Sequence, residues 1–338
     1  MLDDLKNPSN FSNCRILITG ATGSLGKAII QKIINTFPTP ERVVIFSRDE
    51  LKQFEMRNIF NPQRYPYLRY FPGDIRDFQR LEQAFEGIDI VIHAAALKQV
   101  SAAEYNPFEF IKTNILGTQN IVQAALKKNV KKVIALSTDK AVAPINLYGA
   151  SKLCSDKLIL AGNNIAGASK TIFSVVRYGN VLGSRGSVAP LFQSLKKGQV
   201  LPITDPQMTR FNILLEQGVN VVLNSLDQAI GGETFVPKLP SYRILDLAEA
   251  IAPNAEKQII GIRHGEKLHE EMISSSDTNE VLELDESFLI LPPPFDSNQE
   301  RLKEHYGGKL LPSGFSYKSN DNPHFIDVQA LKKLIQSL

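Results

Sequence analysis

Short runs of apolar, often β-branched residues alternate with longer amphipathic segments throughout the first half of the chain. This alternation is typical of βαβ units, so it restricts the fold to a parallel sheet covered by helices on both faces. The strand candidates are Arg15–Thr19, Arg42–Phe46, Leu68–Phe71, Ile88–His93, Lys132–Leu136 and Ile172–Arg177. The helical candidates are Leu25–Asn35, Asp49–Phe60, Phe78–Phe85, Phe108–Lys128 and Leu147–Ala161. We therefore predict an α/β fold built on a doubly wound parallel (Rossmann) sheet.

The pattern changes after about Tyr178, where Gly and Pro become more frequent and the apolar runs become shorter. We predict a dinucleotide-binding domain over residues 1–178 and a smaller mixed α/β substrate-binding lobe over residues 179–338, some elements of which return to the first domain. The segment Asp277–Ser297 is acidic and contains the run Pro292–Pro294. This composition favours an irregular surface excursion.

Composition excludes several classes of function. Hydrophobic residues make up 43% of the chain, as in an ordinary globular protein, and 38 Lys and Arg against 35 Asp and Glu form no concentrated basic run, which argues against nucleic-acid binding. Cys14 and Cys154 are too few for a disulfide framework or a zinc site. The start MLDDLKNPSNFSN is polar, and no apolar run reaches the roughly 20 residues that span a bilayer. We expect a cytoplasmic protein without a membrane partner.

A glycine-rich loop follows the first strand candidate and opens the first helix: Gly20-Ala-Thr-Gly23-Ser-Leu-Gly26. Glycines in this context permit a tight turn and let backbone amides approach a pyrophosphate at the helix N-terminus. The alternative is a plain strand-to-helix turn that is rich in glycine. The residues predicted to bind a dinucleotide cofactor here are Gly20, Thr22, Gly23, Ser24, Leu25 and Gly26.

The second strand ends in Ser47-Arg48-Asp49, where NAD-binding proteins usually carry an acid for the ribose hydroxyls. Ser47 occupies that position and the guanidinium of Arg48 suits a 2′-phosphate, which favours NADP over NAD. Asp49 is either a helix N-cap or a ribose ligand. Small residues after the third and fourth strands leave room for the cofactor, although loop packing alone would explain them. The remaining predicted cofactor contacts are Ser47, Arg48, Asp49, Lys52, Asp74, Ile75, Ala94, Ala95, Ala96, Lys98, Tyr148 and Lys152.

Polar residues at the end of the fifth strand and on the next helix form the candidate catalytic group. Tyr148 and Lys152 are four residues apart and share one helix face, and Ser137-Thr138-Asp139-Lys140 ends the preceding strand, where open α/β sheets bind ligands. A neighbouring ammonium and a cationic nicotinamide favour the tyrosine phenolate, which can accept a hydroxyl proton. A solvated loop with a capping Thr and a surface ion pair is the structural alternative.

Asp139 and Lys140 indicate a second chemical step, because hydroxyl oxidation needs only a hydroxyl, a tyrosine and a lysine. Oxidation of carbon 4 of a hexose acidifies the proton on carbon 5. Lys140 can remove that proton if burial and neighbouring cations lower its pKa, while Asp139 protonates the departing hydroxyl on carbon 6. The hydride then returns to carbon 6, which predicts a 4-keto-6-deoxy sugar and no net consumption of cofactor.

The sequence resembles the UDP-N-acetylglucosamine 4,6-dehydratases of the 5-inverting type, members of the extended short-chain dehydrogenases/reductases that begin pseudaminic acid synthesis. The resemblance covers nearly the whole chain, through AALKQV, AEYNP, KTNILGTQN, STDKAVAPINLYGASKLCSDKL, VVRYGNVLGSRGSV, PITDPQMTRF and GIRHGEKLHE. It implies catalytic roles for Thr138, Asp139, Lys140, Tyr148 and Lys152. It also implies contacts to cofactor and sugar from Lys98, contacts to nucleotide sugar or cofactor from Asn180, Val181 and Arg185, contacts to nucleotide sugar from Thr204, Met208 and Arg210, and contacts to diphosphate and ribose from Arg263 and Glu266.

The same resemblance implies NADP-dependent conversion of UDP-N-acetylglucosamine to UDP-2-acetamido-2,6-dideoxy-β-L-arabino-hexos-4-ulose by a homo-oligomer (dimer or hexamer), and a role in flagellin glycosylation. Ser101, Asn212 and His264 depart from the expected pattern in segments outside the catalytic residues. The short chain without an anchor favours inversion at carbon 5 over the retaining reaction of membrane-bound dehydratases. A UDP-sugar 4-epimerase and a catalytically silent NADP-sensing or scaffold protein are the alternatives. The scattered His93, His264 and His269 predict packing roles, with no metal site.

Overall fold

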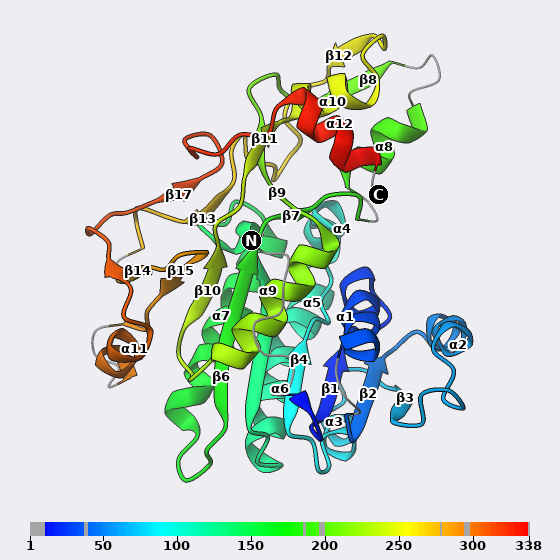
Figure 1. The fold of residues 1–338 in the computed structure, drawn as a ribbon, viewed down its shortest axis with the longest axis vertical. Coiled ribbons are helices and arrows are strands. Elements are labelled where there is room, and N and C mark those ends of the chain that lie inside the picture. Colours follow the sequence, from blue (N-terminus) through cyan, green and yellow to red (C-terminus); the bar gives the residue numbers. More distant parts are fainter. Residues whose placement is uncertain are drawn as a thin grey trace.

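The computed structural model describes residues 11–36, 40–184, 187–195, 200–277, 279–293 and 298–336. Its centre is a 10-stranded sheet with the order β16-β14-β15-β10-β6-β5-β4-β1-β2-β3 within these residues (Figure 1). The six predicted strands pair in parallel in the order β3-β2-β1-β4-β5-β6, which confirms the doubly wound fold. They are β1 (Arg15–Thr19), β2 (Arg42–Ser47), β3 (Leu68–Pro72), β4 (Ile90–His93), β5 (Lys132–Thr138) and β6 (Ile172–Tyr178).

Alternate strand residues pack against helices on opposite faces of the sheet. Ile16 and Ile18 join a core with α1 (Ser24–Thr36) and α9 (Leu215–Gln228), whereas Leu17 faces the other side. The second face is covered by α3 (Phe78–Ala84), α6 (Gly117–Lys127) and α7 (Leu147–Ile165). The helix predicted over Phe108–Lys128 is divided into α5 (Pro107–Phe110), a π-helical segment (Ile111–Leu116) and α6, and it is preceded by α4 (Val100–Tyr105). At the other end of the sheet, α2 (Glu50–Ile59) follows β2.

The second half of the chain contributes further strands to the same sheet. β10 (Thr234–Pro237) pairs in parallel with β6, and β15 (Ser287–Ile290), β14 (Val281–Glu283) and β16 (Lys309–Leu310) continue it in antiparallel orientation. The prediction of an irregular excursion over Asp277–Ser297 is therefore wrong for β14 and β15. Their short apolar cores, such as Phe288–Ile290, are buried by pairing with the distant β10, and the acidic and proline-rich flanks hid this signal.

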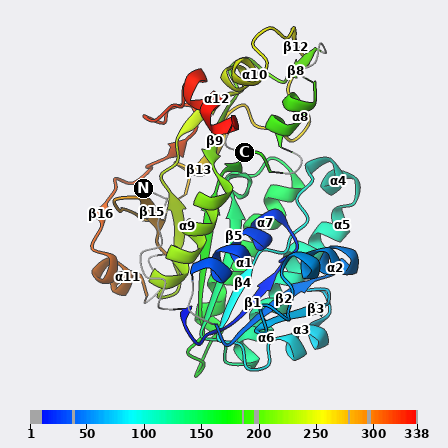
Figure 2. The same cartoon turned by 45° about the vertical axis from the view of Figure 1, so that its right-hand side comes forward.

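Beyond the carboxyl ends of the central strands, the remaining elements form a smaller lobe with its own apolar core (Figures 1 and 2). It contains the sheet β11-β9-β7, the pairs β12-β8 and β13-β17, and three helices. The domain boundary at residue 178 stays a prediction. Four strands that follow this residue, β10, β14, β15 and β16, belong to the central sheet. The bounds are β7 (Asn180–Val181), α8 (Val188–Leu195), β8 (Leu201–Ile203), β9 (Thr209–Ile213), β11 (Ser241–Arg243), α10 (Ile244–Ile251), β12 (Lys257–Ile259), β13 (Glu271–Ile273), β17 (Tyr317–Lys318) and α12 (Val328–Gln336), with α11 (Asn298–Tyr306) beside the sheet edge.

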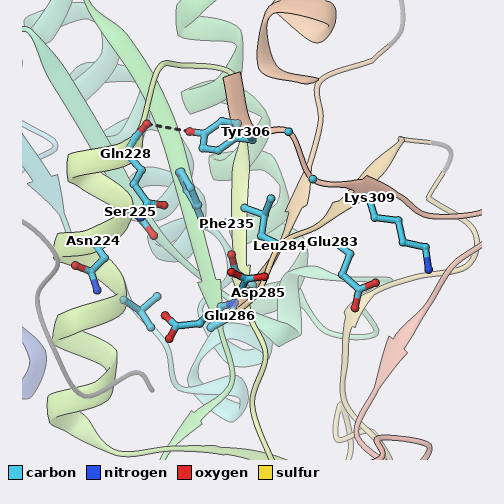
Figure 3. A pocket seen from close by; sticks show the side chains of 15 residues that line it. Asn224, Ser225, Gln228, Phe235, Glu283, Leu284, Asp285, Glu286, Tyr306 and Lys309 are labelled. Carbon is cyan, nitrogen blue, oxygen red and sulfur yellow. Dashed lines mark hydrogen bonds between the residues drawn. The ribbon is translucent and has the colours of Figure 1, made fainter. Parts of the chain in front are cut away.

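A cavity of about 570 Å³ lies at the far edge of the sheet, between α9, the β14–β15 hairpin and the segment after α11 (Figure 3). Tyr306 contributes its ring to this cavity, and its hydroxyl donates to the carbonyl of Gln228 at 3.0 Å. None of the residues predicted to bind cofactor or substrate lines it. The reaction site is therefore expected at the carboxyl ends of the parallel strands.

Candidate active site

A cleft of about 680 Å³ follows the carboxyl ends of the central strands, at the edge where the fold predicts ligand binding. Most of the predicted site residues line it: Gly20, Thr22, Gly23, Ser24, Leu25, Gly26, Ser47, Arg48, Asp49, Lys52, Ile75, Ala94, Ala95, Ala96, Lys98, Thr138, Asp139, Lys140, Tyr148, Lys152, Asn180 and Val181. Those that do not line it are Asp74, Thr204, Met208, Arg210, Arg263 and Glu266. Arg185 lies outside the described residues.

The glycine loop leaves space for a ligand against bare backbone. Gly20 has a φ of +65°, and a Cβ added there would lie 2.8 Å from the amide nitrogen of Ala95. Only glycine therefore allows β1 to turn this close to the end of β4. The N-terminus of the 13-residue helix α1 opens onto the cleft at Ser24, where an anion is stabilised by free amides. This arrangement fits a dinucleotide pyrophosphate.

The segment that follows β2 contains cations and a carboxylate, that of Asp49, which already accepts hydrogen bonds. Asp49 caps α2, accepting from the backbone amide of Lys52 at 3.0 Å and from its Nζ at 2.7 Å. The N-cap role, one of the two left open by the sequence, is therefore the one observed. Arg48 is half-exposed, with its guanidinium 3.6 Å from Asp74. A cationic group is thus available at the strand end where the ribose of a dinucleotide would lie.

The start of α7 packs tightly against the turn after β5. Asn146 caps the helix by accepting from the amide of Gly149 at 2.7 Å. Gly149 has no room for a side chain, because a Cβ would overlap the carbonyl of Lys140. This close approach places Tyr148 and Lys140 on the same cleft wall. One turn later, the buried Lys152 donates its Nζ to the carbonyl of Leu136 at 2.8 Å.

Burial is the dominant influence on the pKa of Tyr148, which it raises to about 12. The charge of Lys140 and the hydroxyl of Thr138 lower this pKa, and the carboxylate of Asp139 raises it. Burial also lowers the pKa of Lys152. Lys140 is therefore a cation that favours the phenolate form of Tyr148 in this structure. The sequence predicted only the base role for Lys140.

The buried Asp139 and the partly exposed Lys140 form an ion pair at the rim of the cleft. Lys140 Nζ lies 3.1 Å from Asp139 Oδ1 and 3.2 Å from Oε1 of Glu270, and Thr138 donates to Asp139 at 2.8 Å. Burial alone would lower the pKa of Lys140, but the two carboxylates outweigh it and raise that pKa. The sequence made the base role conditional on a lowered pKa of Lys140, and this condition is not met in this state, because the charges of Asp139 and Glu270 outweigh the effect of burial.

Glu270 and Arg210 extend this ion pair into the lobe. Arg210 Nε is 3.6 Å from Oε1 of Glu270, and both side chains are buried. The other guanidinium nitrogens of Arg210 donate to the carbonyls of Thr209, Lys267 and Leu268. Arg210, predicted to meet the nucleotide sugar, thus lies behind Lys140. Glu270 is the last residue of GIRHGEKLHE, and nothing in that motif indicated a contact with Lys140.

The family model described as "Polysaccharide biosynthesis protein" matches residues 16–292, which include the glycine loop, Asp139–Lys140 and Glu270. The chain belongs to this family. Its cleft lies at the carboxyl ends of the strands of a Rossmann sheet.

Two relatives and one solved structure span almost the whole chain. A protein of Campylobacter jejuni named "UDP-N-acetylglucosamine 4,6-dehydratase (inverting)" is 51% identical over 331 residues, covering 96% of this chain and 98% of its own. A Rickettsia canadensis protein named "UDP-glucose 4-epimerase" is 38% identical, covering 97% of each chain. The X-ray structure of Pen from Bacillus thuringiensis has a TM-score of 0.85 and 38% identity, covering 97% of this chain and 98% of its own. The prediction of an enzyme of this family is confirmed.

Within the part of the chain that the structure describes, no helix has the length and apolar character needed to cross a membrane. No group of three or more His, Cys, Asp or Glu side chains suited to a metal ion occurs in those residues either. His93 is buried between the hydroxyls of Thr19 at 2.8 Å and Thr118 at 3.2 Å, a packing role of the kind predicted from the sequence.

Proposed function

We propose that this protein dehydrates UDP-N-acetylglucosamine to the UDP-4-keto-6-deoxy sugar with inversion at carbon 5, using bound NADP. The observation that carries the proposal is the ion pair of Asp139 and Lys140 in the same cleft that Tyr148 lines. The 51% identity to a protein named for this reaction supports the substrate and the stereochemistry. We further propose that it acts in pseudaminic acid synthesis for flagellin glycosylation, as a cytoplasmic homo-oligomer.

The residues that would hold the cofactor are the glycine loop, the strand end at Arg48 and Lys152. When bound, NADP supplies the hydride acceptor for carbon 4 and the hydride donor for carbon 6. Tyr148 accepts the proton of the carbon 4 hydroxyl, and the buried Lys152 orients the cofactor ribose from the same helix face. Lys98, Asn180 and Val181 line the part of the cleft left for the sugar.

The elimination requires a neutral amine and a protonated carboxyl, whereas the resting pair carries opposite charges. A hydrogen bond of 3.1 Å joins Lys140 Nζ to Asp139 Oδ1, so one proton transfer along it produces both required forms. Burial raises the pKa of Asp139, which favours its protonated form. Lys140 then removes the carbon 5 proton, Asp139 protonates the departing carbon 6 hydroxyl, and the resting charges are restored as water leaves. To complete the product, hydride enters carbon 6 and a proton from solvent reaches carbon 5 on the face opposite to the one that lost its proton.

A 4-epimerase is the second candidate, because a full-length relative at 38% identity carries that name. Epimerisation needs Tyr148 but leaves the Asp139–Lys140–Glu270 network without a chemical role. The two are separated by mass spectrometry of the product formed from UDP-N-acetylglucosamine. Dehydration removes one water, whereas an epimer has the mass of the substrate and would refute the proposal.

For Arg48→Ala we expect a selective loss of NADP affinity. A charge-assisted pair to a 2′-phosphate contributes about 1.5–3 kcal/mol, so NADP binding should weaken about 10-fold to 100-fold while NAD binding changes little. Titration calorimetry with both dinucleotides measures the difference. Arg57→Ala is the matched control, because Arg57 lies in the last turn of α2, the helix that begins shortly after Arg48. Equal losses for NADP and NAD would remove Arg48 from the 2′-phosphate.

A further inference from the structure

We propose that Glu270 is a positioning residue for the elimination, delivered by the smaller lobe to control where the proton of the Asp139–Lys140 pair resides. This inference rests on the proposed dehydration and assigns a function to a residue outside the cleft lining. Glu270 does not contact the sugar site directly, since it lies behind Lys140 and acts through it.

Geometry makes Glu270 the second anchor of Lys140. The Nζ atom lies between Asp139 Oδ1 at 3.1 Å and Glu270 Oε1 at 3.2 Å, so its position is fixed from two sides. The side chains of Asp139 and Glu270 are 1% and 3% exposed, so little water reaches the two carboxylates, whereas the side chain of Lys140 is 25% exposed at the cleft. Loss of one carboxylate would therefore alter both the position and the charge balance of the base.

The backbone of Glu270 is held rigidly by the C-terminal part of the chain. Its amide donates to the hydroxyl of Ser319 at 2.9 Å, and its carbonyl accepts from the Ser319 amide at 2.8 Å. β13 begins at the next residue and pairs with β17. Oε2 of Glu270 is also buried, and no hydrogen-bond partner for it is present among the described residues. The position is thus imposed by the fold of the lobe.

Charge balance explains why this carboxylate stays ionised while Asp139 takes the proton. Lys140 and Arg210 lower the pKa of Glu270 against its burial. Burial raises the pKa of Asp139, and the charge of Glu270 raises it further. A proton that leaves Lys140 therefore passes to Asp139, and the Glu270–Arg210 pair remains neutral overall. The titratable and charged groups that face this network from all packed elements are Asp139, Lys140, Tyr148, Asp156, Arg210, Tyr242, Lys267 and Glu270.

The charges of Glu270 and Arg210 determine the direction in which each variant should move the pH profile. Glu270 adds a negative charge that raises the pKa of both Asp139 and Lys140, whereas Arg210 lowers the pKa of Lys140. Removing the negative charge with Glu270→Gln lowers both pKa values, so the pH range in which the pair holds one proton moves to lower pH. Removing the positive charge with Arg210→Gln moves it to higher pH.

The test is the pH dependence of kcat for water loss at saturating UDP-N-acetylglucosamine, with the full-length protein loaded with NADP. We expect the acid limb of Glu270→Gln to lie about 1 unit or more below that of the native enzyme, and the limb of Arg210→Gln to lie above it. A merely structural role would lower the rate without opposite shifts. Unshifted limbs, or shifts in the same direction, would overturn the inference.

Glu233→Gln is the matched control, because Glu233 is a fully buried carboxylate bonded to Ser174 and the Ile230 amide, away from the cleft. It should lose thermal stability and keep the native pH profile. If Glu270→Gln does not fold, the direction of the Arg210→Gln shift decides alone. Failure of the native enzyme to release water refutes the proposed function itself, whereas native activity with unshifted variants refutes only the role of Glu270.

Discussion

Lys140→Ala is expected to lower kcat for dehydration about 10²-fold to 10⁴-fold, the range that a positioned general base contributes. The variant removes the only amine that the structure places against Asp139 at the cleft rim within the described residues. NADP binding should persist, because the glycine loop and Arg48 lie on other strands. Product formation by mass spectrometry and NADP affinity by calorimetry measure the two effects on the same sample.

Lys131→Ala is the matched control for this loss. Lys131 immediately precedes β5, at the end of the strand opposite Lys140, and its side chain is 75% exposed. This control should retain native kcat and nearly native stability. Lys140→Ala itself should melt at a lower temperature, since it leaves the buried carboxylates of Asp139 and Glu270 facing each other. A folded Lys140→Ala protein that makes 4-keto product at the native rate would refute the base assignment.

Tyr148→Phe should cause a loss of similar size, because it removes the hydroxyl that accepts the carbon 4 proton while it preserves the ring. The side chain is 8% exposed and packs with Ala103 and Phe110, so the ring keeps its contacts in the variant. We expect kcat to fall about 10²-fold to 10⁴-fold with an unchanged melting temperature. Steady-state assay of the 4-keto product and a thermal melt provide the two readings.

Tyr317→Phe is the matched control for Tyr148→Phe, because the Tyr317 hydroxyl has a structural role. The Tyr317 hydroxyl donates to the carbonyl of Leu239 at 2.7 Å and accepts from its amide at 2.8 Å. Its loss should cost about 0.5–1.5 kcal/mol of unfolding free energy or more, with kcat unchanged. If Tyr148→Phe behaved like Tyr317→Phe, losing stability and keeping activity, Tyr148 would have no role in the chemistry.

Local patterns were sufficient to predict the half of the fold that holds the cofactor cleft. β1, β2, β4, β5 and β6 are inner strands of the sheet that are buried on both faces, so each reads as a short apolar run between helical segments, and β3 is the edge strand. The glycine loop and the Tyr148–Lys152 spacing are also local, and their place in a βαβ series determines where they lie. This is why most residues predicted for the cofactor and the chemistry line a single cleft.

Features that depend on contacts between distant segments could not be predicted in this way. β15 pairs with the distant β10, β14 pairs with β15, and the polar flanks of both strands gave no strand signal. Glu270 is 130 residues from Lys140 in sequence and meets it only because the lobe folds over the end of β5. The charges of Asp139 and then of Glu270 raise the pKa of Lys140, so a condition based on burial and cations alone left out the groups that determine its direction.

Conversion of UDP-N-acetylglucosamine in heavy water, followed by mass spectrometry and proton NMR, tests the central claim most directly. Removal of the carbon 5 proton and its replacement from solvent should leave one deuterium at carbon 5 of a product that has lost water. Ring couplings should show the inverted configuration. A product that retains its water, or one that has lost water but carries hydrogen at carbon 5, would contradict elimination by Asp139 and Lys140.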